Sequence, residues 1–113
     1  MEIKFYKEAA AGGWLSLSFE EQMGNIGSEV GRVAQWKGES TNSFENAVQR
    51  ALELFELTLK DERWGERLKD VAKMKEVFCS AVADDSNRGK LTLEELDRKL
   101  LPFAIAARKD LTF

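Results

Sequence analysis

The feature that most restricts the fold is the segment from Ser18 to Trp36, in which apolar residues recur at three- and four-residue steps. This spacing places them on one face of an α-helix. Ser18 and Glu21 stand at capping-box positions, so we expect the helix to begin at Ser18 and to run to about Trp36. Its core face comprises Phe19, Met23, Ile26, Val30 and Val33.

A column of small residues flanks this core face, and it contains Gly24, Gly27, Gly31 and Ala34. Each glycine weakens a helix by roughly 1 kcal/mol relative to alanine. Three glycines in one column therefore indicate the close approach of another backbone, either a neighbouring helix or a second subunit.

The opposite flank of the same helix is polar, and it contains Gln22, Asn25, Glu29, Arg32 and Trp36. A plain hydrophobic core does not require such a stripe. We therefore treat it as the candidate functional surface, with Trp36 either stacking on a nucleobase or anchoring the helix end.

Three further helices are expected, at about 43–59, 64–83 and 92–108, the last with a kink at Pro102. Residues 1–17 are expected to form an irregular lead-in. The whole chain, 1–113, is predicted to be a single all-α domain, similar to a four-helix bundle and completed by oligomerisation.

The helix at 64–83 is expected to direct Trp64, Leu68, Val71, Phe78, Cys79 and Val82 inward. Lys75 falls within this apolar stripe, where an unpaired ammonium would be costly. It must reach past the edge of the core or meet a carboxylate, with Glu29 or Glu53 as the natural partner.

Composition excludes several classes of function. The net charge is −3, and 17 basic residues are interleaved with 20 acidic ones, so the sequence predicts no basic patch that would bind the nucleic-acid backbone. No segment is apolar enough for a signal peptide or a membrane span, and one cysteine cannot form an internal disulfide, so we expect a cytoplasmic protein. The absence of histidine excludes catalysis by Ser-His or Cys-His pairs.

The segment from Asp84 to Glu95 resembles the calcium-binding loop of an EF-hand. Residues fit the first, third, sixth, eighth, ninth and twelfth positions of that loop: Asp84, Ser86, Gly89, Leu91, Thr92 and Glu95. Arg88 departs from the pattern at the fifth position, where it places a positive charge. A helix end followed by a Thr-x-x-Glu capping box explains half of the match without calcium.

Carboxylates on two neighbouring helices can hold a divalent cation that binds nucleotide phosphates. Glu29, Glu53 and Glu56 are the candidate ligands of such a cation. The alternative is salt-bridged helix flanks, in which Glu29 pairs with Arg32 and Glu53 with Arg50.

Several runs resemble a family of small uncharacterised microbial proteins whose fold is similar to the all-α nucleoside triphosphate pyrophosphatases, the MazG-like group. The runs are Trp14-Leu15-Ser16-Leu17, residues 22–32 from Gln22 to Arg32, residues 51–58 from Ala51 to Thr58, Arg67-Leu68-Lys69 and residues 75–79 from Lys75 to Cys79. The resemblance implies magnesium-dependent cleavage of nucleoside triphosphates to monophosphate and pyrophosphate. It also implies subunit pairing, and metal held by Glu-Glu-x-x-Glu and Glu-x-x-Asp motifs.

Carried over, the first motif falls on Ser28-Glu29-x-x-Arg32 and the second on Glu53-x-x-Glu56. Ser28 and Arg32 make the first motif more positive than three acids, which opposes binding of a cation. Arg32 and Lys75 could instead bind phosphate directly. The candidate nucleotide or polar site is therefore Asn25, Glu29, Arg32, Trp36, Glu53, Glu56 and Lys75.

Three functions are compatible with these patterns. The first is a nucleotide-handling protein with an atypical MazG-like site. The second is a non-catalytic helical interaction module that forms a homo-oligomer, and the third is a calcium-binding protein with a single EF-hand-like loop.

Overall fold

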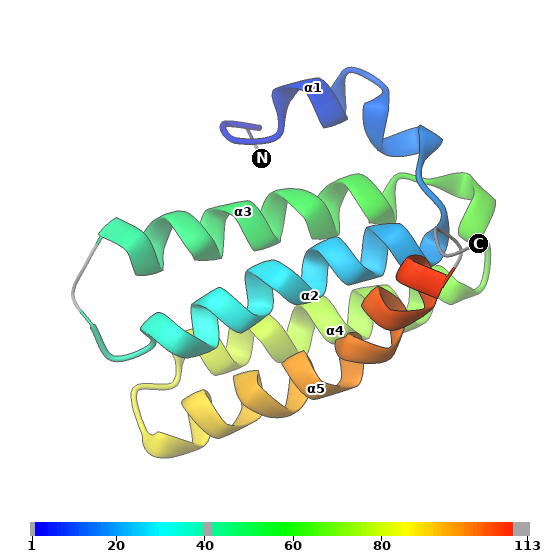
Figure 1. The fold of residues 1–113 in the computed structure, drawn as a ribbon. Coiled ribbons are helices and arrows are strands. Elements are labelled where there is room, and N and C mark those ends of the chain that lie inside the picture. Colours follow the sequence, from blue (N-terminus) through cyan, green and yellow to red (C-terminus); the bar gives the residue numbers. More distant parts are fainter. Residues whose placement is uncertain (1, 40–41, 110–113) are drawn as a thin grey trace.

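The computed structural model describes residues 2–39 and 42–109, and all of its regular structure within these ranges is helical. A short helix α1 (Lys7–Ala10) and a 3₁₀ turn η1 (Gly13–Ser16) precede the bundle, and a second turn η2 (Glu62–Trp64) joins α3 to α4. The four long helices are α2 (Phe19–Trp36), α3 (Asn42–Leu59), α4 (Arg67–Ala83) and α5 (Asn87–Lys109), as Figure 1 shows. The all-α class is confirmed. Residues 1, 40–41 and 110–113 of the predicted domain lie outside the described ranges.

Helix α2 begins as the sequence predicts. The Ser18 hydroxyl accepts a hydrogen bond from the Glu21 N–H at 3.1 Å, and the Glu21 carboxylate accepts one from the Ser18 N–H at 3.0 Å. This reciprocal pair satisfies two N–H groups that would otherwise lack partners at the helix start. The predicted core face of α2 is buried throughout.

The glycine column of α2 faces α5. A Cβ atom at Gly24 would lie 3.0 Å from the Cα of Ala104, and one at Gly27 would lie 3.0 Å from the Cβ of Leu100. The order of these contacts shows that the two helices run antiparallel. The close approach predicted from the three glycines is therefore made within the chain, by a neighbouring helix.

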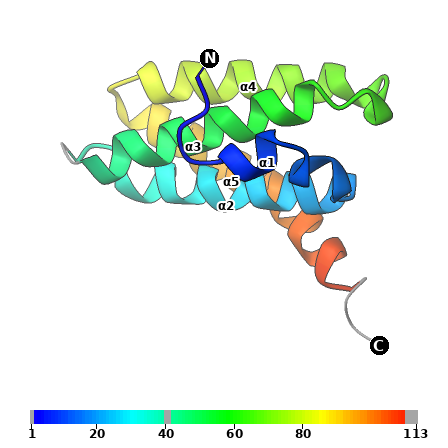
Figure 2. The same ribbon diagram turned by 90° about the horizontal axis from the view of Figure 1, so that it is seen from above.

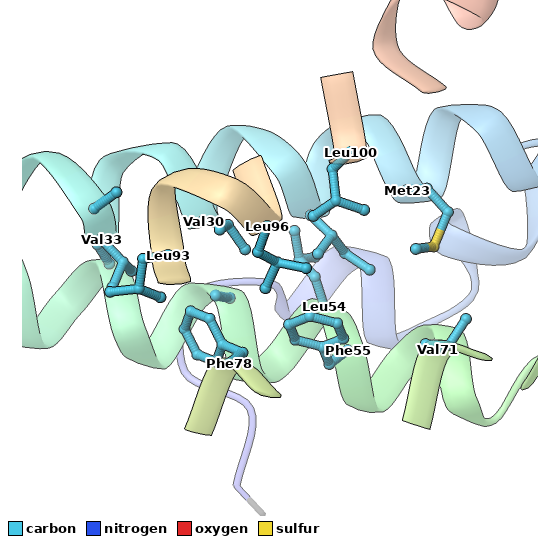
Figure 3. Packing of buried hydrophobic residues seen from close by; sticks show 14 of the residues in the cluster. Met23, Val30, Val33, Leu54, Phe55, Val71, Phe78, Leu93, Leu96 and Leu100 are labelled. Atoms are coloured by element: carbon cyan, nitrogen blue, oxygen red, sulfur yellow. The ribbon is translucent and has the colours of Figure 1, made fainter. Parts of the chain in front are cut away.

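The core lies between the four long helices, and Figure 3 shows side chains from each of them meeting there. Phe55 of α3 and Phe78 of α4 lie with their ring centroids 5.6 Å apart at the centre. Burying side chains of this size contributes roughly 1.5–3 kcal/mol each. The largest apolar residues that are fully buried are Phe55, Phe78, Met23, Ile26, Leu54, Leu93, Leu100, Val30, Val33 and Val71.

The predicted start of the last helix, at residue 92, is wrong. Helix α5 begins at Asn87, so Gly89, Thr92 and Glu95 are helical and the loop geometry of an EF-hand is not formed. Ser86 explains the earlier start, because its hydroxyl accepts from the Arg88 N–H at 3.3 Å and its carbonyl accepts from the Gly89 N–H at 3.1 Å. Gly89 is also required sterically, since a Cβ atom there would lie 2.2 Å from the Asp84 carbonyl oxygen.

Two expectations for the helix at 64–83 are also corrected. Helix α4 begins at Arg67, because Trp64 belongs to the preceding turn η2, which Gly65 ends with a φ of 52°. Cys79 is exposed on α4 and does not belong to the core. The neighbouring Phe78 occupies the inward position, and a residue one step along a helix points about 100° away from it.

Helix α5 continues through Pro102 as one helix, and Figure 2 shows its C-terminal part bending away from the bundle. An interior proline removes one backbone hydrogen bond and crowds the preceding turn, which accounts for the bend. Within the described ranges, no helix combines the length and the hydrophobicity that crossing a bilayer requires.

Candidate functional site

Glu29 is almost fully buried on α2, and two arginines and a tyrosine surround it. The Nε atom of Arg50, on α3, lies 2.6 Å from one carboxylate oxygen, and Arg32 pairs with the other. The Tyr6 side chain is hydrogen-bonded to Glu29 as well. The carboxylate is therefore neutralised by the chain's own cations.

The surroundings of Glu29 also affect the pKa of Tyr6. Burial raises the pKa of its phenol above the ordinary value, and the negative charge of Glu29 raises it further, while Arg50 and Arg32 oppose the increase. The Tyr6 hydroxyl therefore stays protonated and acts as a donor toward Glu29.

Glu53 is completely buried on α3, and its carboxylate holds the N-terminal segment. It accepts hydrogen bonds from the backbone N–H groups of Lys4, Phe5 and Tyr6 at 3.0, 2.9 and 3.0 Å, and from the Gln49 amide at 3.0 Å. A carboxylate offers about four lone-pair positions, so these donors occupy all of them.

The protonation state of Glu53 follows from these bonds. Burial by itself raises the pKa of this carboxyl group, but the hydrogen bonds from Tyr6, Gln49, Lys4 and Phe5 together lower it below its ordinary value. Glu53 is therefore ionised at neutral pH although water does not reach it.

Glu56 lies one turn further along α3 and faces α4, where it pairs with Lys75. This hydrogen bond is the main cause that lowers the pKa of Glu56. Of the two outcomes that the sequence leaves open for Lys75, the structure shows the pairing with a carboxylate. The expected identity, Glu29 or Glu53, is wrong, because both of those residues turn toward the N-terminal segment.

The remaining predicted site residues do not join this group. Asn25 is exposed, and its amide donates to the Glu21 carbonyl oxygen of its own helix at 2.8 Å. Trp36 is half-buried at the end of α2. None of the seven predicted residues lines the hollow of about 520 Å³ between the α2–α3 and α4–α5 connections, which Lys37, Phe44, Val82 and Lys90 help to line.

The three acids predicted as metal ligands consequently do not fit a divalent cation as they are folded. Both oxygens of Glu29 are bound by arginines and both oxygens of Glu53 by N–H donors, while one oxygen of Glu56 is bound by Lys75. Within the described ranges, no three carboxylate or cysteine side chains converge in a geometry that could hold a metal ion.

Sequence reasoning missed the part played by the N-terminal segment. Its residues Phe5 and Tyr6 are half-buried against the bundle, and they connect Glu53 of α3 to Glu29 of α2. No periodicity marks residues 2–6, so this contact had no sequence pattern to predict it. Arg50 was considered as a partner for Glu53, but it pairs with Glu29 across the two helices.

A second buried polar cluster, centred on Gln22, was also missed. The Gln22 amide donates to the Trp14 carbonyl oxygen and to the Asp61 carboxylate, both at 2.9 Å, and its oxygen accepts from the Trp64 indole at 2.9 Å. The Trp14 indole donates to the Thr58 hydroxyl at 3.0 Å. This cluster fastens the lead-in to the ends of α2 and α3.

The side chains of both polar clusters are fully hydrogen-bonded, because every buried side-chain nitrogen and oxygen within the described ranges has a hydrogen-bond partner.

No protein-family model, curated protein or solved structure matches the chain. The resemblance to the pyrophosphatase fold stays a prediction.

Proposed function

We propose that the chain is a non-catalytic helical interaction module whose buried acids serve the fold. The observation that supports this proposal is the state of Glu29, Glu53 and Glu56, whose carboxylates are bound by donors of the chain itself. A catalytic carboxylate must reach a substrate or a metal, but Glu29 and Glu53 are buried in the fold and Glu56 is paired with Lys75.

Nucleotide handling in a MazG-like manner stays the second candidate. Glu29 and Glu53 lie on the neighbouring helices α2 and α3 and are both bonded to Tyr6, so displacement of the N-terminal segment would free two acids together. A magnesium-bound nucleoside triphosphate would have to supply the energy of that displacement.

Apo stability of the carboxylate variants tests whether these acids hold the fold together. Unpaired acids that lie close together repel one another, so their neutralisation raises stability, whereas neutralising acids that bind donors of the fold lowers it. We expect Glu29→Gln and Glu53→Gln to lower the melting temperature. Glu45→Gln, at an exposed position of α3, is the matched control and should leave it unchanged.

Ligand linkage provides the direct test. Nucleoside triphosphates with magnesium or manganese, added at about millimolar concentration, should leave the melting temperature unchanged, since only a ligand that binds the folded state raises it. No pyrophosphate should be released. A melting shift or pyrophosphate release that Glu29→Gln abolishes would favour the nucleotide function and overturn the interaction module.

A further inference from the structure

The outer face of α5 carries a row of residues at alternating three- and four-residue steps: Leu91, Glu94, Arg98, Leu101 and Ile105. Leu91, Leu101 and Ile105 are 57%, 55% and 46% exposed, although large aliphatic side chains in this chain are otherwise mostly in the core. This spacing is the a and d pattern of helices that pair along a seam.

This row lies opposite the side of α5 that packs on the bundle. Asp97, Leu100 and Ala104 approach the three glycines of α2, and the row is displaced from them around the helix. Figure 1 shows the first part of α5 (yellow to orange) along the lower edge of the molecule, with α2 and α4 above it and no described helix below it, while its C-terminal part (red) rises at the right.

The two charged residues of the row form no ion pair with each other. Glu94 and Arg98 stand four residues apart on one helix, where an ion pair can form. Nevertheless, neither side chain forms an ion pair or a side-chain hydrogen bond with any residue in the described ranges. Three exposed aliphatic residues thus share one face of α5 with a half-buried glutamate and an exposed arginine.

We propose that this face binds the same face of a second copy of the chain, with the two α5 helices antiparallel. Antiparallel pairing centred near Leu96 places Leu91 against Leu101 of the partner subunit and Glu94 against Arg98 of the partner subunit. Two-fold symmetry repeats each contact, so the surface is complementary to itself in both hydrophobicity and charge. The inference rests on the proposed interaction module, for which it supplies the partner.

The parallel arrangement is disfavoured by the same residues, because it would place Glu94 against Glu94 and Arg98 against Arg98 of the partner subunit. The row is short, and specific interfaces of small area are weak and transient. We therefore expect an equilibrium between monomer and dimer that depends on concentration, and the test must extend to high concentration.

The test is the mass in solution, by sedimentation or light scattering, up to about 1 mM chain, where even a millimolar dissociation constant is detectable. The parent chain should approach the mass of a dimer. Glu94→Arg and Arg98→Glu should each stay monomeric alone, because each places like charges across the seam. An equimolar mixture of the two variants should dimerise, because each then supplies the charges that the other needs.

The mixture distinguishes charge repulsion across an interface from a loss of helix stability in the variants. Mixing restores opposite charges across the interface, but it cannot restore the stability of a destabilised helix. Leu101→Ser should weaken the dimer at least tenfold, while Leu15→Ser, at a leucine of η1 that is 56% exposed, should not change it. A parent chain that stays monomeric at 1 mM overturns the inference, and so does a mixture that does not associate. If the dimer forms as proposed but hydrolyses nucleotides, the inferred interface stands and only the proposal of a non-catalytic function is overturned.

Discussion

The backbone N–H of Tyr6 lies 3.0 Å from the Oε1 atom of Glu53, and this contact joins two residues that are 47 positions apart. Lys4 and Phe5 donate to the same carboxylate. One buried charge on α3 thereby binds three consecutive backbone N–H groups of the N-terminal segment.

Glu53→Gln should consequently destabilise the protein and release this segment. The new amide presents an NH₂ group where the carboxylate oxygen accepted from backbone donors, and a buried donor without an acceptor costs about 1–3 kcal/mol, more where a charge is lost. We expect a decrease of about 2–3 kcal/mol in the free energy of unfolding, measured by urea denaturation. Amide hydrogen exchange at Lys4, Phe5 and Tyr6 should become faster.

The control for Glu53→Gln is Glu45→Gln, which alters an exposed side chain on the same helix. It should change stability by less than about 0.5 kcal/mol. Unchanged exchange at Tyr6 in Glu53→Gln would show that other contacts hold the segment.

The glycines of α2 should respond differently to alanine. At Gly24 the added Cβ would lie 3.0 Å from the backbone of Ala104, which cannot move alone, so Gly24→Ala should lower stability by about 1–3 kcal/mol. At Gly31 the nearest atom is the Asp97 Oδ1 at 3.1 Å, the end of a side chain that can rotate. Gly31→Ala should therefore gain up to about 1 kcal/mol from helix propensity.

Thermal unfolding measures the change in melting temperature of the two glycine variants, which should be a decrease for Gly24→Ala and an increase for Gly31→Ala. Two decreases of equal size would mean that α5 approaches α2 equally closely along its length. Two increases would mean that the helices lie further apart than the contacts at Gly24 indicate.

The two arginines that bind Glu29 should also differ in importance. The side chain of Arg50 is 27% exposed and that of Arg32 is 53% exposed, so solvent screens the second pair more strongly. We expect Arg50→Met to cost about 1–3 kcal/mol and Arg32→Met about 0–1 kcal/mol, because the buried Glu29 charge is left less compensated in the first case. Equal losses in urea denaturation would assign both arginines the same role.

Asp61 should make stability depend on pH in the acid range. Hydrogen bonds from Arg63, with one from Gln22, lower the pKa of this buried carboxyl group to about 2, against the opposing effect of burial. Because the folded pKa is below the unfolded one, the ionised group contributes stability above about pH 4, and this contribution is lost as the pH falls through about 2.

Asp61→Asn should therefore be less stable than the parent by about 2 kcal/mol at neutral pH, since one pKa unit corresponds to about 1.4 kcal/mol. The difference should shrink toward zero as the pH falls through about 2, because the parent carboxyl group then becomes protonated. Denaturation at both pH values provides the measurement, with the exposed Asp85→Asn as a control. A difference independent of pH would show that Asp61 acts through shape rather than charge.

Local pattern explains which predictions of the fold succeeded. Ser18 and Glu21 are close in sequence, and their mutual hydrogen bonds need nothing from the rest of the chain, so the sequence predicts the start of α2 correctly. The start of α5 was not, because Thr92 and Glu95 also satisfy a capping pattern. The choice between the two starts depended on Ser86 and on the close fit of Gly89 against Asp84.

The sequence by itself determined the helical class, the core face of α2 and the polar stripe beside it, because each depends on spacing along one helix. Only the tertiary structure decided the partners of those charges. Glu53 meets the backbone of residues 4–6, Glu29 meets Arg50, and Glu56 meets Lys75, through contacts between segments that no periodicity relates. A carboxylate has the same appearance in sequence whether it binds a metal or an N–H group, and the difference lies in which donor the fold brings within about 3 Å.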